Sequence, residues 1–149
     1  MLSFVSPRFV RTYFVIAAIA ATSAAPISVR AEGNNLGYGR GGSFGDYDGT
    51  VNQFNTSGEK FRIRGRCASA CTLFLAIKNV CIEPSARLMF HAGNSGAGKS
   101  LSPLATAHMM SAYNSQLRSY LDAGGYMSTR NFHSIAGSAM ISKFGYRGC

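Results

Sequence analysis

The sequence contains few carboxylates, no internal repeats and only one long apolar run. Of its 149 residues, 6 are Asp or Glu and 15 are Lys or Arg, which gives a formal net charge of +9. The absence of repeats excludes a solenoid or a propeller. Beyond the first 31 residues, no apolar run approaches the ~20 residues that a membrane-spanning helix needs, which excludes a multi-span membrane protein. After position 91 the only carboxylate is Asp122.

The apolar run lies in the first 31 residues and has the three parts of an export signal. Arg8 and Arg11 precede it, the run covers the 14 uncharged residues 12–25, and a cleavage site follows at Ala31. The run is short for a membrane anchor. We therefore predict that residues 1–31 are a signal peptide and that the mature chain is periplasmic or secreted by a bacterium, with an uncleaved anchor as the alternative.

The mature chain remains basic. Three arginines leave with residues 1–31, so the net charge falls from +9 to +6 over residues 32–149. A basic surface can attract nucleic acid or anionic lipid, but a solvated basic surface is the more common case. We expect no nucleic-acid partner and membrane contact only during export. The sequence does not predict an oligomeric state.

All four cysteines lie in the mature chain, at Cys67, Cys71, Cys81 and Cys149. An even number of cysteines in a small exported domain predicts two disulfides, with any of the three possible pairings. A zinc site is the alternative, but such sites usually carry paired Cys-x-x-Cys spacings that this chain lacks. We therefore predict two disulfides, and neither a metal nor a cofactor.

The mature chain divides into a glycine-rich segment and one domain in which strands and helices alternate. Residues 32–45 are rich in Gly and Asn and are predicted as loop, with at most a poor strand over 36–38. Within residues 46–149, apolar patterns predict helices over 46–55, 68–77, 102–123 and 128–135, and strands over 61–64, 79–82 and 87–90. This alternation predicts an α/β fold.

Ser69 occupies the position in the sequence that most favours chemistry. A strand is predicted to end at Gly65 and a helix to begin near Ser69, so the serine hydroxyl would lie among free N–H groups that stabilise negative charge. Such a serine suits nucleophilic catalysis through an oxyanion, and it equally suits a plain helix cap. His91 ends a later strand, and the Gly-Gly turn at 41–42 offers a backbone N–H.

These three elements, in this order, resemble the Clp protease proteolytic subunit and its small exported bacterial relatives, within the Clp/crotonase fold. The matching segments are Gly41-Gly42-Ser43, the GRCASA of residues 65–70 and the PSARLMFH of residues 84–91. The resemblance implies a reduced Clp protease/crotonase-like domain, held together here by disulfides. It also implies a serine hydrolase of peptides or small acyl substrates, with Ser69 as nucleophile and His91 as general base. The N–H groups of Gly42 and Ala70 would form its oxyanion hole.

The chain departs from this family at the third member of the catalytic triad. The family carries an Asp well after the histidine, whereas here only Asp122 follows, at the end of a predicted helix. Loss of an orienting carboxylate costs about 10⁴ in rate in a serine protease. The sequence therefore predicts either a Ser69–His91 dyad of low activity or, as the alternative, a non-catalytic periplasmic binding or structural module on the same fold.

A further alternative is a nucleotide binder, because residues 93–100 fit the phosphate-binding pattern G-x-x-x-x-G-K-[ST]. In such a loop the helix begins at the lysine, but Ser102-Pro103 predicts a later start here, and no later apolar strand ends in an Asp for Mg²⁺. We therefore interpret the segment as a flexible loop. Of the other histidines, His108 is predicted as a core or boundary residue, and His133 has no evident partner.

Overall fold

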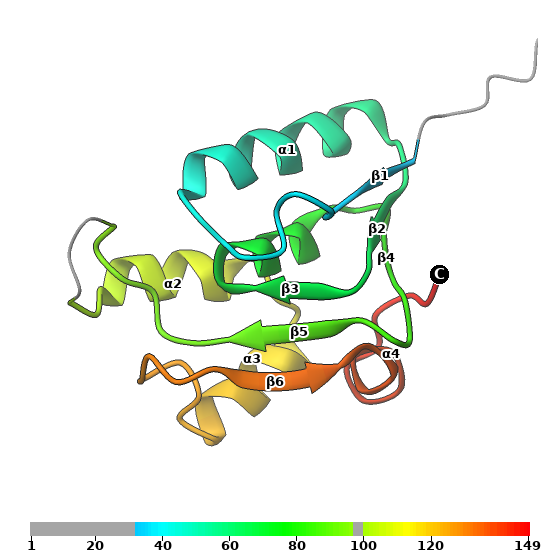
Figure 1. Ribbon diagram of the computed structural model, residues 1–149. Helices are drawn as coiled ribbons and strands as arrows, with labels where there is room; N and C mark the ends of the chain where they lie inside the picture. Colours follow the sequence, from blue (N-terminus) through cyan, green and yellow to red (C-terminus); the bar gives the residue numbers. More distant parts are fainter. Residues whose placement is uncertain (1–31, 97–99) are drawn as a thin grey trace, which may run out of the picture.

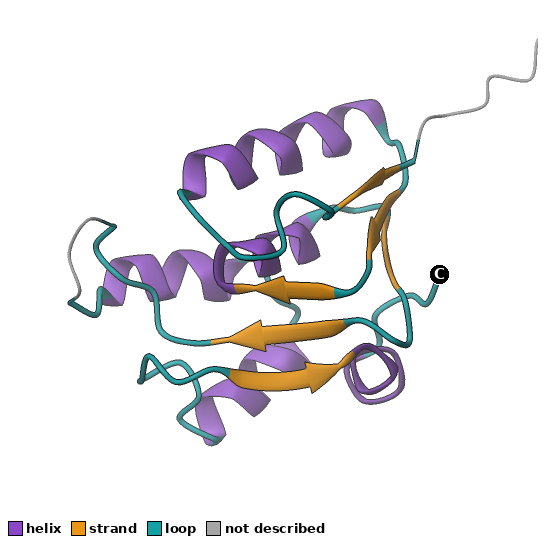
Figure 2. Cartoon of the chain, viewed as in Figure 1, coloured by secondary structure: helices purple, strands orange, loops and turns teal. Residues whose placement is uncertain are grey.

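The computed structural model describes residues 32–96 and 100–149 and shows a mixed α/β domain (Figure 1, Figure 2). The predicted signal peptide lies outside the described residues, as does the 97–99 part of the 93–100 motif. The described strands form two three-stranded sheets, ordered β1-β2-β4 and β3-β5-β6. In Figure 1 the two sheets meet at a corner, where the chain passes from β2 into β3 and from β4 into β5.

The first sheet is parallel and contains β1 (Gly33–Asn34), β2 (Phe61–Ile63) and β4 (Val80–Ile82). It confirms the strands predicted over 61–64 and 79–82. The poor strand predicted over 36–38 is wrong, because residues 36–40 form turns. The chain leaves the sheet at the buried Asn35, whose side chain accepts a hydrogen bond from Arg64 N at 2.7 Å and donates to Arg66 O at 3.0 Å.

The second sheet contains β3 (Arg66–Ala68), β5 (Arg87–Phe90) and β6 (His133–Ala136). Strand β5 matches the prediction over 87–90 and pairs parallel to β3 and antiparallel to β6. The helix predicted over 128–135 is therefore wrong, and its last residues form strand β6. The strand is stabilised by its ladder with β5, in which Ile135 lies opposite the buried Leu88, and this distant partner cannot be recognised from a local pattern.

The helices agree with the sequence patterns in part. Helix α1 (Phe44–Ser57) confirms the helix over 46–55, and the buried segment predicted over 68–77 is a 3-10 helix, η1 (Ser69–Ala76). The long helix predicted over 102–123 is instead two helices, α2 (Pro103–Ser111) and α3 (Ser115–Ala123). Asn114 separates them, because its side chain caps α3 at Leu117 N and also donates to Phe144 O. Helix α4 (Gly137–Phe144) follows β6.

The core surrounds η1, which contacts α1, α2 and strands of both sheets. Its largest fully buried side chains include Phe61, Phe74 and Phe90. The two predicted disulfides are confirmed, with the pairing Cys67–Cys71 and Cys81–Cys149. In the described ranges, no helix is both long and apolar enough to cross a membrane.

Candidate active site

Ser69 lies at the junction of β3 and η1 in a backbone conformation that few residues adopt. Its φ is +57°, which makes it the only non-glycine residue with positive φ in the described part of the chain. Such conformations cost free energy and persist where the surroundings impose them, often at functional sites. Here the buried Cys67–Cys71 disulfide brackets Ser69, and Thr72 Oγ1 donates to the Ser69 carbonyl at 2.7 Å. The turn is thus held on both sides of the serine.

His91 follows strand β5 and reaches this serine. The distance between His91 Nε2 and Ser69 Oγ is 2.7 Å, which is a short hydrogen bond between a nucleophile and a base. Burial of the ring lowers the pKa of His91 below its ordinary value, and the backbone of Ala92 partly opposes this effect. The imidazole is therefore neutral at neutral pH, as a proton acceptor must be.

The other ring nitrogen of His91 is unusual, because Nδ1 is buried and has no hydrogen-bond partner among the described residues. All six carboxylates of the sequence lie in the described part, and none comes within 4.0 Å of His91. An aromatic ring packs against the imidazole: the Phe132 and His91 centroids are 4.7 Å apart at an interplanar angle of 76°. Asp122, the last carboxylate of the chain, is exposed on α3.

The Gly-Gly turn predicted from the sequence packs directly against Ser69. A Cβ atom on Gly41 would lie 2.7 Å from Ser69 Cβ and 2.9 Å from Ala68 O, and the φ of Gly41 is +82°. Only glycine fits this approach without displacement of the turn. The next residue, Gly42, lies on the wall of the pocket that contains Ser69.

Gly41→Ala is therefore expected to reduce any reaction of Ser69 by about 10²-fold, the effect of losing one oxyanion donor, because the added methyl group pushes the turn away from the serine. The measurement is the rate at which a serine-directed fluorophosphonate labels the protein. Gly37→Ala is the matched control, since Gly37 has a φ of +96° and nothing within 4 Å of an added Cβ. Equal rates in the two variants would contradict the expectation.

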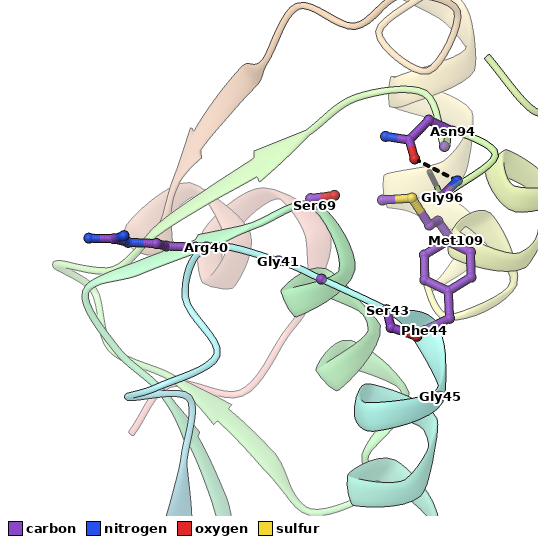
Figure 3. A pocket seen from close by; sticks show the side chains of 11 residues that line it. Arg40, Gly41, Ser43, Phe44, Gly45, Ser69, Asn94, Gly96 and Met109 are labelled. Carbon is purple, nitrogen blue, oxygen red and sulfur yellow. Dashed lines mark hydrogen bonds between the residues drawn. The ribbon is translucent and has the colours of Figure 1, made fainter. Parts of the chain in front are cut away.

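A pocket of about 730 Å³ opens in front of Ser69. Its wall includes Gly42, Phe44, Asn94 and Met109. In Figure 3 the Ser69 hydroxyl points toward the side of the pocket where Phe44, Asn94 and Met109 gather, and the Arg40 side chain extends the other way. The pocket can hold an apolar group beside the hydroxyl.

Ala70 does not line this pocket. Its side chain is fully buried beneath Ser69, and its N–H belongs to the first turn of η1, where amide groups lack a partner within the helix. The structure thus brings Ser69, His91 and the Gly41-Gly42 turn together, with Ala70 adjacent in the chain. The assignment of the Gly42 and Ala70 N–H groups as an oxyanion hole remains a prediction.

The sequence did not reveal two contacts of this site. Thr72, which holds the Ser69 carbonyl, also makes a 2.6 Å hydrogen bond to the buried Tyr113 hydroxyl, and burial raises the pKa of that phenol. Phe132 contacts His91 from the segment before β6. A threonine three residues after the serine was the one available signal for the first contact. The second has no local signal.

The remaining histidines lie in other environments. The prediction of His108 as a core or boundary residue is wrong, because its side chain is exposed and its Nε2 lies 3.1 Å from both carboxylate oxygens of Asp48. His133 has partners that the sequence did not reveal: its ring stacks on Tyr126 with centroids 3.4 Å apart, and its Nε2 lies 3.0 Å from the Tyr120 hydroxyl.

The described ends of the 93–100 segment lie before a helix that begins later in the chain, whereas Lys99 lies outside the described residues. Helix α2 begins at Pro103 with the Ser102 hydroxyl accepting from Ala105 N, and a bridge joins Asn94 to Leu101. In residues 32–96 and 100–149, no three His, Cys, Asp or Glu side chains gather in a way that could hold a metal ion.

Comparisons with protein-family models and with curated proteins found no match for this chain. The geometry around Ser69 is therefore the basis for its proposed function.

Proposed function

We propose that the mature chain is an exported serine hydrolase in which Ser69 is the nucleophile and His91 the general base. The observation that carries the proposal is the 2.7 Å hydrogen bond between Ser69 Oγ and His91 Nε2, made by a serine in a strained backbone conformation at the wall of a pocket. The resemblance to the Clp protease family extends the proposal to a reduced Clp/crotonase-like fold and to peptides or small acyl compounds as substrates.

The reaction follows from the positions of these groups. Ser69 Oγ attacks the substrate carbonyl carbon while His91 Nε2 takes the hydroxyl proton, and His91 then returns that proton to the leaving group. A water molecule, deprotonated by the same nitrogen, hydrolyses the acyl-serine and regenerates the free hydroxyl. The N–H groups of Gly42 and Ala70 are proposed to stabilise the oxyanion of both steps.

The two disulfides support the exported location that the N-terminal segment predicts. Cys67–Cys71 and Cys81–Cys149 together use every cysteine of the chain. Disulfides persist in oxidising compartments such as the bacterial periplasm and the extracellular space and are rare in the cytosol. We therefore propose a periplasmic or secreted protein.

Labelling with a fluorophosphonate probe tests the proposed activity directly. The purified, oxidised protein is expected to become labelled at one serine, and Ser69→Ala is expected to lose that labelling because the phosphonylated atom is removed. Ser43→Ala is the control, since Ser43 lines the same pocket. A folded protein that takes no label, or one whose labelling survives in Ser69→Ala, would exclude an activated Ser69.

The second candidate is a non-catalytic binding or structural module. It is favoured because, among the described residues, no group forms a hydrogen bond with His91 Nδ1, where a serine protease carries its orienting carboxylate. For such a module, Ser69→Ala changes only stability, by about 1 kcal/mol, the usual size of a lost hydrogen bond. The labelling experiment separates the two candidates.

A further inference from the structure

His91 Nδ1 requires an explanation of its own. The residue is only 7% exposed, and a buried ring nitrogen without a partner is rare, because nearly all buried polar atoms form hydrogen bonds. The aromatic ring packed against the imidazole is itself exposed, since Phe132 is 44% exposed. The protonation state of Nδ1 matters for reactivity only because it determines whether Nε2 accepts from Ser69 or donates to it. The inference drawn from this nitrogen therefore rests on the proposed function.

The two neutral tautomers of His91 have opposite consequences for Ser69. With the proton on Nε2, the ring donates to Ser69 Oγ across the 2.7 Å contact, and the base has no lone pair for the hydroxyl proton. With the proton on Nδ1, Nε2 accepts from the Ser69 hydroxyl, which is the arrangement that a nucleophile needs. Only the second tautomer places an N–H donor at the buried, unpartnered position.

An acceptor at Nδ1 is what normally selects the productive tautomer. In serine proteases a buried Asp performs this task, and its amide analogue lowers the rate by about 10⁴ because the ring adopts the wrong tautomer. The Ala92 backbone acts to raise the pKa of His91, but it makes no hydrogen bond with Nδ1. Without a hydrogen-bonded acceptor at Nδ1, a neutral imidazole favours the proton on Nε2, and a buried N–H donor at Nδ1 is penalised further. The surroundings of His91 therefore favour the unproductive tautomer.

Phe132 comes from the neighbouring strand segment and packs against the His91 ring. The ladder of β5 and β6 pairs Phe90 with His133, so His91 and Phe132 are the next residues along the two antiparallel chains. Directly opposed residues at such positions have side chains in contact, and here the two rings meet edge to face. A shorter polar side chain at 132 would place its end group beside the imidazole.

We propose that His91 rests with its ring proton mainly on Nε2, as a donor to Ser69, and that the side chain at position 132 sets how much of this pair occupies the nucleophilic tautomer. Phe132 is thus a positioning residue that withholds an acceptor from Nδ1. The change from the resting tautomer to the nucleophilic one moves one proton from Nε2 to Nδ1 of His91 through solvent. The net charge of the ring stays the same.

Nitrogen-15 NMR of the histidine rings tests this directly, because a protonated and a bare ring nitrogen resonate far apart. The spectrum of the oxidised protein is recorded at pH 8, above the lowered pKa of His91, with His91→Gln for assignment. Phe132→Asp supplies a carboxylate, and Phe132→Leu is the matched control, since Leu has the same branched shape without an acceptor.

In the parent and in Phe132→Leu we expect the proton of His91 on Nε2. In Phe132→Asp we expect it on Nδ1, with a higher pKa for the imidazole because the neighbouring carboxylate stabilises its charged form. Fluorophosphonate labelling of Ser69 should then be at least about tenfold faster than in Phe132→Leu, within the roughly 10⁴-fold that an orienting carboxylate supplies.

The outcomes separate this inference from the proposed function. A parent spectrum with the proton on Nδ1 overturns the inference, whatever the labelling rate, and needs no variant that might fold poorly. A folded Phe132→Asp with an unchanged tautomer also overturns it. If the tautomers behave as expected but Ser69 is labelled in neither variant, the assignment of the His91 tautomers holds and the proposed hydrolase is wrong. If Ser69 is labelled at equal rates in the two variants, the role given to position 132 is wrong.

Discussion

Replacing His91 by alanine is expected to slow the labelling of Ser69 by a fluorophosphonate roughly 10²–10⁴-fold, the contribution of a general base. His91 Nε2 is the one group within hydrogen-bond distance of Ser69 Oγ among the described contacts of that atom. Even if the His91 ring rests in the unproductive tautomer, it visits the productive one. Removing the ring therefore abolishes the activation of Ser69 that remains. The fold should survive, because the substitution also removes the buried, unpartnered Nδ1.

Two controls make the His91→Ala result specific. His133→Ala removes a histidine of the same sheet whose ring contacts Tyr120 and Tyr126, and it should leave the labelling rate unchanged. The pH profile of the parent is the second control. Burial lowers the pKa of His91, so the neutral ring and the labelling rate persist to a lower pH than with an ordinary histidine, with a midpoint below 6.5. A midpoint above that value would assign the titration to another group.

Removal of the Cys81–Cys149 disulfide is expected to lower the free energy of unfolding by about 4 kcal/mol in the chain-entropy account of cross-links. The bond joins residues 68 positions apart, so its loss releases a large loop in the unfolded chain. It also holds the C-terminus against β4, where Cys149 N donates to Ile82 O at 3.1 Å. Urea unfolding of Cys81→Ala/Cys149→Ala, compared with the parent, measures the loss.

The other disulfide is the natural comparison, because its sequence separation is only 4. The same account gives about 2 kcal/mol for a loop of this size. Cys67–Cys71 brackets Ser69, however, so Cys67→Ala/Cys71→Ala should reduce the labelling of Ser69 more than the long-range pair does. If the two double variants lost equal free energy of unfolding, loop entropy would not be the main contribution of these disulfides to stability.

Some residues of the candidate site could be predicted from local sequence patterns, and Phe132 could not. Gly41 lies in a predicted turn, and Ser69 and His91 lie at the ends of predicted elements. In the structure Gly41 and Ser69 line one pocket, and His91 is hydrogen-bonded to Ser69. Their positions depend on short-range patterns: a glycine pair, a strand that ends before a serine, and a strand that ends in a histidine. Phe132 belongs to a segment whose local pattern suggested a helix.

Local patterns were sufficient wherever neighbouring residues determine the structure. Strand β5 alternates and ends at Phe90, directly before His91, as expected. Helix α1 follows its apolar spacing, and α2 begins where Ser102 and Pro103 predict a cap and a first turn. The even number of cysteines was likewise sufficient to predict two disulfides, since that inference needs only composition and an oxidising compartment.

Contacts between distant residues decided the rest. The Cys81–Cys149 pairing, the break between α2 and α3 at Asn114 and the strand β6 all depend on partners 30 or more residues away, such as Phe144 for Asn114 and Leu88 for Ile135. The state of His91 is of the same kind. Its lone Nδ1 and the ring of Phe132 beside it follow from the β5–β6 ladder, because the free energy of strand pairing resides in cross-chain hydrogen bonds and side-chain packing that no local window contains.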